Sequence, residues 1–349
     1  MEWWALGALF VFSGLISWFL TPAVLRYCRR HRTFDTFDER KLHTRLVPRL
    51  GGVAIFVAVS LGLFAALLLT YAGRLHMPIF ESRLVPAIYV GLCGFFFIGF
   101  ADDLRSLPAL PRLLAQIAVA TGTVLLSGEG GVRITAAFGH PLHLEPWAEV
   151  AITVLWIVGI ANTFNWIDGL DGLASGVAAI CAIGFLALAL LHPGLPYSAL
   201  TAALSVVLVG SLLGFLPYNF FPARIFIGDG GAFSLGYLLA VVSVVGLFKQ
   251  AAVISFIVPI TILALPIFDT AFAILRRIVR GKSPVAPDNK HIHHRMLALL
   301  NRAYRERLPS DELTRIEEKV IQRRAHRDTV LWLYAVCAVC AGIAIWIGR

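Results

Sequence analysis

Long apolar stretches alternate with short polar ones along the whole chain. Many of these stretches approach the length that crosses a bilayer as a helix, about 17–25 residues. We predict ten spanning helices, at residues 3–25, 51–72, 84–101, 113–128, 147–163, two within 172–223, then 230–248, 251–275 and 329–348. The pair within 172–223 is divided at 192–196, where proline and glycine interrupt a helix. The expected fold is an all-α integral membrane protein, organised as one polytopic domain over residues 1–349.

Composition agrees with this pattern. Of the 349 residues 58% are hydrophobic and 15% are charged, and the mean hydropathy is +0.78. A soluble globular protein has about 45–50% apolar and about 25% charged residues, so ordinary soluble and disordered classes are excluded. The net charge of +9 does not indicate nucleic-acid binding, because the basic residues lie between the predicted spans. Of five cysteines only Cys337 and Cys340 form a pair with CxxC spacing, and we interpret both as packing residues.

The basic residues indicate which side of the membrane each loop occupies. Segments joining the spans on one side hold 25 of the 30 lysines and arginines. These segments are 26–50, 101–112, 164–171, 217–229 and 276–328. Because cytoplasmic loops are enriched in Lys and Arg, we expect these loops in the cytoplasm and both termini outside.

Carboxylates gather at the cytoplasmic ends of the predicted spans. They are Asp102, Asp103, Asp168, Asp171 and Asp229. Ionisable groups near membrane depth are costly and usually functional. The Asp102-Asp103 pair is not the DDxxD of an isoprenoid synthase, since Ser106 stands at the last position. The Asp168-Gly169 array also lacks the Ala-Arg that a CDP-alcohol phosphotransferase has after its first Asp-Gly.

The chemistry of these residues favours a hard cation. Asn165, Asp168 and Asp171 recur every third residue, which places them roughly on one face if they are helical. Mg²⁺ takes few protein carboxylates and keeps positions for phosphate oxygens. Asp229 lies in a glycine-rich turn before an apolar run, where a helix N-terminus can face an anion.

A basic segment precedes the last span and contains His291, His293 and His294. Three histidines are compatible with a transition-metal site. The flanking Lys290 and Arg295 instead favour phosphate binding. The remainder of the segment, to about residue 327, predicts an amphipathic helix in solvent or on the membrane surface. Asp269, inside the ninth span, is interpreted as a structural pairing residue within the bundle.

Together these motifs resemble the polyprenyl-phosphate N-acetylhexosamine-1-phosphate transferases. The likeness runs from about residue 40 to 297, in five blocks that follow the family order. The blocks are Arg40-Lys41-Leu42-His43 with Pro48-Arg49-Leu50-Gly51-Gly52, the Asp102-Asp103 pair, the Asn165/Asp168/Asp171 block, Gly228-Asp229, and His291-Ile292-His293-His294. The form of the histidine block is similar to the branch that uses UDP-GlcNAc. One departure is Ala232, where the family usually has Ser.

The resemblance implies a reaction. GlcNAc-1-phosphate is transferred from UDP-GlcNAc to undecaprenyl phosphate with release of UMP, starting an O-antigen, common antigen or teichoic acid. A UDP-MurNAc-pentapeptide donor, another UDP-HexNAc, and more distantly an ion-coupled transporter are the alternatives. Direct attack by the lipid phosphate and an aspartyl-bound intermediate both stay open. The expected location is the bacterial plasma (inner) membrane, with the active site in the cytoplasm, no nucleic-acid partner, and a homodimer as an open question.

The resemblance also implies roles for individual residues. The expected cofactor is Mg²⁺, with Mn²⁺ as the alternative. The expected metal ligands are Asn165 and Asp229. The expected catalytic residues are Asp102, Asp103, Asp168 and Asp171, with Asp102 orienting or deprotonating the lipid phosphate. The expected substrate-binding residues are Lys41, His43, His291, His293, His294 and Arg295.

Overall fold

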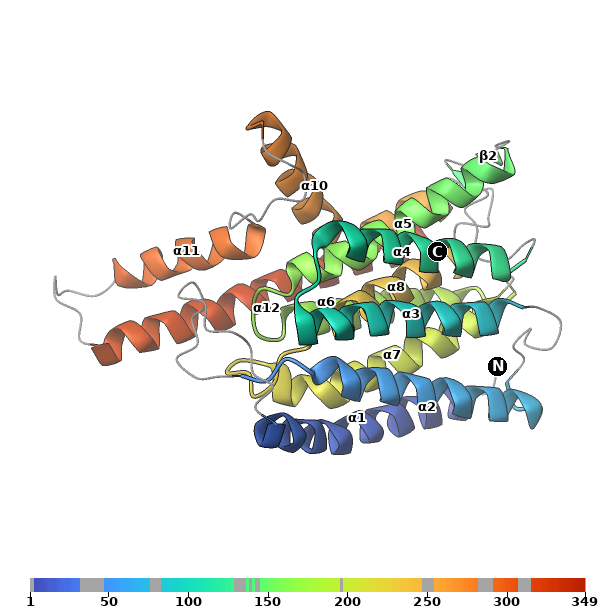
Figure 1. The fold of residues 1–349 in the computed structure, drawn as a ribbon, viewed down its shortest axis with the longest axis horizontal. Coiled ribbons are helices and arrows are strands. Elements are labelled where there is room, and N and C mark those ends of the chain that lie inside the picture. The colour runs from blue at the N-terminus through green and yellow to red at the C-terminus, as the bar shows by residue number, and fades with distance from the viewer. Residues whose placement is uncertain are drawn as a thin grey trace.

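The structure is a computed structural model in which helices make up almost all of the regular elements (Figure 1). It describes residues 3–31, 47–75, 83–128, 136–137, 140–141, 145–194, 197–246, 254–281, 291–306 and 315–348. The helices are α1 (Trp3–His31), α2 (Gly51–Tyr71), α3 (Leu84–Arg105), α4 (Ala109–Leu126), α5 (Pro146–Ile167), α6 (Leu173–Leu191), α7 (Ser198–Asn219), α8 (Gly228–Gly246), α9 (Ile254–Ile262), α10 (Ala264–Val279), α11 (Ile292–Arg305) and α12 (Arg315–Ile347). A two-residue antiparallel pair, β1 (Ala136–Ala137) with β2 (His140–Pro141), is an element the sequence did not predict.

Within the described residues, nine helices are long and apolar enough to cross a membrane: α1 to α8 and α12. Large apolar side chains on their outer faces are exposed, among them Phe19, Leu155 and Trp346. Such a surface suits contact with lipid acyl chains, since it would be unfavourable in water. The chain is therefore a multi-pass membrane protein. The predicted spans at 113–128 and 147–163 are confirmed as α4 and α5.

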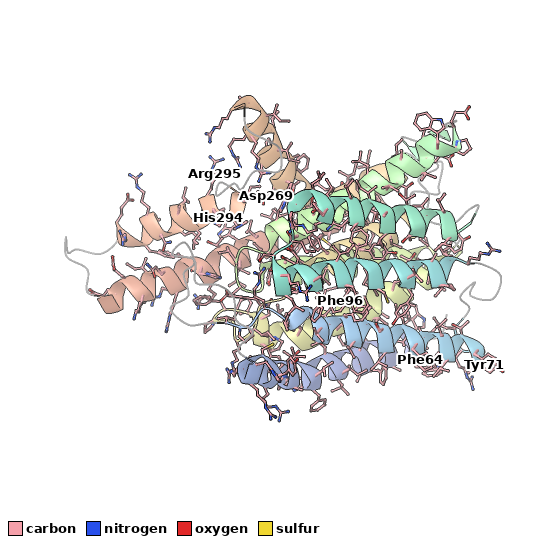
Figure 2. All side chains as sticks on the ribbon, in the orientation of Figure 1. Phe64, Tyr71, Phe96, Asp269, His294 and Arg295 are labelled. Carbon is pink, nitrogen blue, oxygen red and sulfur yellow. The ribbon has the colours of Figure 1, made fainter. Side chains whose placement is uncertain are left out.

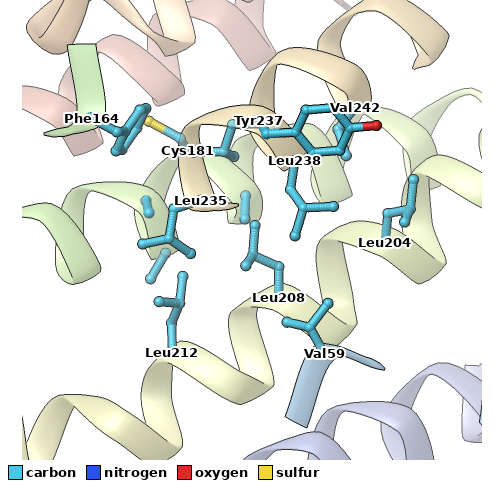
Figure 3. Packing of buried hydrophobic residues seen from close by; sticks show 14 of the residues in the cluster. Val59, Phe164, Cys181, Leu204, Leu208, Leu212, Leu235, Tyr237, Leu238 and Val242 are labelled. Atoms are coloured by element: carbon cyan, nitrogen blue, oxygen red, sulfur yellow. The ribbon is translucent and has the colours of Figure 1, made fainter. Parts of the chain in front are cut away.

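The most enclosed element is α8. In its most apolar 18-residue stretch 94% of the residues are buried, against 22% in α4. Figure 3 shows Leu235, Tyr237 and Leu238 of α8 beside side chains of α7, α6 and α5. The last of these long apolar helices, α12, joins the bundle beside α6, where Sγ of buried Cys337 lies 3.7 Å from Sγ of Cys181. Because α8 begins with Gly228-Asp229, the central helix carries a predicted metal ligand at its first turn.

The segment 251–275, predicted as a single ninth span, is not one continuous helix in the structure. It contains two helices, α9 and α10, which meet at Leu263. Pro266 lies in the first turn of α10, the part of a helix where a missing N–H is tolerated. In Figure 1, α10 diverges from the bundle direction rather than continuing through it.

In the polar segment before the last span, the described residues are mostly helical. It contains α11 and the first turns of α12, and α12 continues without a break to Ile347. Both helices extend beyond the end of the bundle (Figure 1). The labelled chain ends lie toward the opposite end. The helical structure expected before residue 327 is confirmed, but it lies in two helices, α11 and the start of α12, and of these α12 is the one that continues into the last span.

Candidate active site

Three helix ends converge on Asp229. Asn165, in the last turn of α5, donates from Nδ2 to Asp229 Oδ1 at 2.6 Å. Arg49, just before α2, lies with Nη2 3.4 Å from Asp229 Oδ2. From the end of α3, the Asp103 carboxylate accepts hydrogen bonds from the N–H groups of Asp229 (2.9 Å) and Gly230 (3.0 Å). Residues far apart in sequence are thus held around Asp229, two of them at its carboxylate and one at its backbone.

The hydrogen bonds from α8 to Asp103 are explained by the unpaired N–H groups at the start of a helix. The first N–H groups of a helix have no partner within it, and a carboxylate there also complements the helix dipole. Asp103 satisfies two such groups of α8 and is itself 2% exposed as a side chain. The approach is close because α3 has glycine at position 99, where a Cβ would lie 2.4 Å from the backbone oxygen of Asp229. Asp103 therefore positions Asp229, and its assignment as a catalytic group stays a prediction.

Asp102 has a different set of partners. It accepts a hydrogen bond from the N–H of Leu107 at 2.6 Å and forms an ion pair with Arg112, near the start of α4. The Arg112 guanidinium also lies over the Phe233 ring of α8, 5.5 Å from its centroid. Asp102 is close enough to Asp229 for their charges to interact. Any phosphate that reaches Asp102 would therefore meet Arg112 as well.

Asp168 and Asp171 lie in the turn that follows α5. Burial, with the nearby charge of Asp229 as the next cause, raises the pKa of Asp168 well above its usual value. No described residue donates a hydrogen bond to its carboxylate. Asp171 is instead enclosed: its Oδ2 accepts the N–H of Ala223 at 2.9 Å, and its own N–H donates to His326 Nε2 at 3.1 Å. Asp168 is thus available to a ligand, whereas Asp171 organises the loop.

The histidine block begins α11 and is anchored by Asp269 of α10. Asp269 Oδ2 lies 3.0 Å from His291 Nδ1, and Oδ1 accepts the N–H of Ile292 at 2.7 Å. Asp269 therefore has a pairing role as expected, but its partners lie at the start of α11 and not within the bundle. In Figure 2, Asp269, His294 and Arg295 lie near one another where α10 and α11 meet, at the end opposite Tyr71.

His293 links this block to the aspartate loop. Its side chain is 1% exposed, and a Cβ on Gly169 would lie 2.3 Å from its Nε2. Neither ring nitrogen has a hydrogen-bond partner among the described residues. Burial, followed by the charge of His294, lowers the pKa of His293 to about 3. His293 is therefore a neutral ring packed on the loop, while Arg295 beside it is exposed.

The donor set fits a magnesium ion with a phosphate ligand. Among the described residues no group of three His, Cys, Asp or Glu side chains has metal-binding geometry. Mg²⁺ is, however, commonly held by one or two carboxylates together with water and substrate phosphates. Asp229, Asp168 and the amide oxygen of Asn165 could supply those ligands. In the structure the amide of Asn165 presents Nδ2 to Asp229. Rotating the amide by half a turn would present its oxygen instead.

The structure brings most predicted residues to one end of the bundle. Lys41 and His43 lie outside the described residues. Sequence reasoning did not assign a role to Arg49, Arg112 or His326. Arg49 stands in the Pro48–Gly52 block that carried the resemblance, so a signal for it was present. Arg112 and His326 had no such signal, because each acts through a contact between segments distant in the chain.

Comparisons with known proteins show which sequences this chain is similar to. Residues 85–247 match the model of "Glycosyl transferase family 4". A relative from Bacillus subtilis (strain 168), "Probable undecaprenyl-phosphate N-acetylglucosaminyl 1-phosphate transferase", is 40% identical over 83% of this chain and 76% of its own. A relative from Thermotoga maritima, "Undecaprenyl-phosphate alpha-N-acetylglucosaminyl 1-phosphate transferase", is 31% identical over 81% and 79%. A "Phospho-N-acetylmuramoyl-pentapeptide-transferase" from Staphylococcus haemolyticus is 29% identical over 67% and 74%.

Proposed function

The chain belongs to glycosyl transferase family 4, and on that premise we propose that it transfers GlcNAc-1-phosphate from UDP-GlcNAc to undecaprenyl phosphate. The products are undecaprenyl-diphosphate-GlcNAc and UMP, and the reaction starts a cell-envelope polysaccharide. The observation that carries the proposal is the convergence of Asn165, Asp103 and Arg49 on Asp229 at the first turn of α8. A diphosphate needs such a site, in which a cation and an arginine can share its charge.

Phosphoryl transfer depends mainly on positioning and on neutralising charge. A Mg²⁺ ion held by Asp229 and Asn165 would neutralise the diphosphate and stabilise the departing UMP. Asp103 binds the N–H of Asp229 and so holds the first turn of α8, and Arg49 lies against the carboxylates of both Asp103 and Asp229. Asp168 is the carboxylate left for the substrate or the metal. Mn²⁺ is the alternative ion in this proposal.

We place the lipid phosphate next to Asp102. Arg112 is paired with Asp102 and can turn to a phosphate, whose charge it matches as a bidentate donor. An oxygen of the lipid phosphate then attacks the sugar-side phosphorus, one P–O bond forms, and the bond to UMP breaks. Direct attack needs no covalent aspartyl intermediate, and only a slight base, since the second pKa of a phosphate monoester is about 6.

The histidine block is proposed to hold the nucleotide or the sugar. Arg295 is exposed and His294 is half-buried, so both can reach a ligand. His291 is fixed by Asp269, which leaves its Nε2 to interact. Because His293 is enclosed against Gly169, we reassign it from direct binding to support of the loop. Lys41 and His43 stay in the proposal as phosphate contacts.

The proposed location follows from charge and substrate. UDP-sugars are cytosolic, and the segments holding 25 of the 30 basic residues are those that carry the aspartates and histidines. We therefore place the active site on the cytoplasmic face of a bacterial plasma (inner) membrane, with both termini outside. A homodimer is compatible with this arrangement.

The test is a purified enzyme assay. Protein in detergent is incubated with Mg²⁺, undecaprenyl phosphate and one labelled UDP-sugar at a time, and UMP and glycolipid are both measured. We expect UMP only with UDP-GlcNAc, and no activity after chelation with EDTA. Activity restored by Mn²⁺ alone would change the proposed cofactor. Product from a UDP-MurNAc-pentapeptide donor would change the proposed donor, and no UMP from any UDP-sugar would exclude the function.

A further inference from the structure

The last helix contacts the turn that carries Asp168 and Asp171. His326 of α12 accepts the N–H of Asp171 on Nε2 at 3.1 Å. Two turns further along the same helix, the Tyr334 hydroxyl donates to the carbonyl oxygen of Gly172. Residues eight apart lie on one face of a helix, so one face of α12 binds backbone groups of two successive residues, the N–H of Asp171 and the carbonyl oxygen of Gly172.

His326 also joins this turn to a second loop. Its ring lies on the Phe221 ring with centroids 4.4 Å apart and planes inclined by 28°. The Asp171 carboxylate accepts the N–H of Ala223 from the same loop at 2.9 Å. That loop leads into α8 and Asp229. His326 is therefore enclosed between the two segments that deliver Asp168 and Asp229, and it is 2% exposed.

The packing of Tyr334 is equally close. A Cβ on Gly176 would lie 2.0 Å from the Tyr334 ring, and one on Gly172 would lie 3.3 Å from its hydroxyl. Gly172 has a φ of 77°, in the region that glycine enters without strain. The two glycines thus let α12 approach the start of α6 directly, and the phenol occupies the space between them.

We propose that His326 and Tyr334 are positioning residues for the reaction, holding the Asp168–Gly172 turn in the geometry that the transfer requires. This inference rests on the proposed function. It extends the site to α12, which lies beyond the residues matched by the family model, 85–247. Because His326 is enclosed, it acts through Asp171 and does not contact the substrate.

The substitutions separate the hydrogen bond from the packing. In His326→Phe the stacking surface on Phe221 is kept and the acceptor is lost. In His326→Gln the side-chain oxygen can take the place of Nε2. Tyr334→Phe removes only the hydroxyl that binds Gly172. His192→Gln is the matched control, since His192 also joins α12 to another helix through a backbone oxygen, that of Gly348, near the other end of α12.

Two measurements are made on the 349-residue chain in detergent. Hydrogen exchange followed by mass spectrometry reports the backbone amides of residues 168–172, and steady-state kinetics reports kcat and KM for UDP-GlcNAc. A buried donor left without an acceptor is costly, so we expect faster amide exchange in His326→Phe and a kcat lowered about 10- to 100-fold, since a slight misplacement can cost about that much. His326→Gln should stay within about 5-fold of wild type, His192→Gln should be unchanged, and Tyr334→Phe should show a smaller effect in the same direction.

The outcomes distinguish this inference from the proposed function. Failure of the wild type to release UMP would exclude the function, while the exchange experiment would still test the contact. Unchanged exchange and unchanged kcat in His326→Phe would overturn the inference. Equal losses in His326→Gln and His326→Phe would also overturn it, because packing and not the acceptor would then be the requirement. If His326→Phe does not fold, Tyr334→Phe carries the same test.

Discussion

At the scale of single residues, the contacts of Asp229 are made by residues that are distant from it in the sequence. Its Oδ1 accepts from Asn165, its Oδ2 faces Arg49, and its own N–H is bound by Asp103. The hydrogen bond from the Asp229 N–H to Asp103 would persist if the Asp229 side chain were made neutral. Asp229 can therefore be neutralised without unfolding the turn that carries it, which makes its charge testable by itself.

We expect Asp229→Asn to lower turnover at least about 100-fold, the scale seen when one group stabilising transition-state charge is lost. The thermal midpoint should change little, because asparagine has nearly the same size. UMP release at saturating substrates is the measurement. Glu306→Gln, which breaks the exposed pair with Arg302, is the control and should retain full activity. Full Mg²⁺-dependent turnover in Asp229→Asn would remove the metal assignment.

His293 makes stability depend on pH. Its pKa is about 3 in the folded protein, against 6.5 for an ordinary histidine. Between these values the unfolded chain binds a proton that the folded chain does not, so stability is complete above pH 6.5 and falls as pH decreases toward 3. One pKa unit corresponds to about 1.36 kcal/mol, so the free energy of unfolding at pH 4.5 should be about 2–3 kcal/mol lower than at neutral pH.

The comparison that isolates this residue is with His293→Leu. Thermal or denaturant unfolding of both proteins is followed at pH 7 and pH 4.5. Wild type should lose more stability on acidification than the variant, by about the amount above. Equal losses in the two proteins would contradict the burial of a neutral His293.

At the scale of elements, Gly99 allows the backbones of α3 and α8 to approach each other closely. A Cβ at Gly99 would be 2.4 Å from the Asp229 backbone oxygen, whereas one at Gly122 of α4 would have no neighbour within 4 Å. Alanine favours a helix over glycine by up to about 1 kcal/mol. We therefore expect Gly122→Ala to be neutral or stabilising, and Gly99→Ala to destabilise by about 1–3 kcal/mol.

Thermal unfolding and UMP release test this pair of variants together. Gly99→Ala should also lose activity, since separating α3 from α8 breaks the two hydrogen bonds of Asp103. Equal stability of the two alanine variants would show that α3 and α8 do not meet at this distance.

The start of α11 is fixed by another element. Asp269 of α10 binds both the ring of His291 and the N–H of Ile292, which resembles a capping interaction supplied from a distance. Loss of a cap costs about 0.5–2 kcal/mol. We expect Asp269→Ala to raise KM for the UDP-sugar, because the histidine block loses its orientation, and Asp269→Asn to recover part of that loss. Kinetics that are identical for both variants and wild type would exclude this role.

At the scale of the whole molecule, the distribution of basic residues predicts orientation. Arg74 and Arg302 are both exposed, and the first belongs to the group of loops expected outside. In a variant without native cysteines, Arg74→Cys should react with a membrane-impermeant maleimide in intact cells. Arg302→Cys should react only after permeabilisation. The reverse pattern would invert the topology and place the aspartates on the wrong side for UDP-sugars.

Much of the fold could be read from apolar runs, because a bilayer demands long stretches without charge. This requirement marked α1 to α8 and the last span. It could not distinguish a straight span from the broken α9–α10 segment, since both are apolar. Nor could it show that α12 begins at Arg315, because its polar turns are supported by α11, through contacts such as Tyr304 with Asp328.

The candidate site, like the fold, could be predicted only in part from the sequence. The sequence by itself determined which residues carry charge at the polar ends of the spans, because a low charged fraction leaves few residues capable of chemistry. Only the tertiary structure decided what each of them contacts: Asp103 with the N–H groups of α8, Asp102 with Arg112, Asp171 with His326. The physical reason is that hydrogen bonds and ion pairs depend on distances of about 3 Å between atoms, and these distances are set by how helices pack.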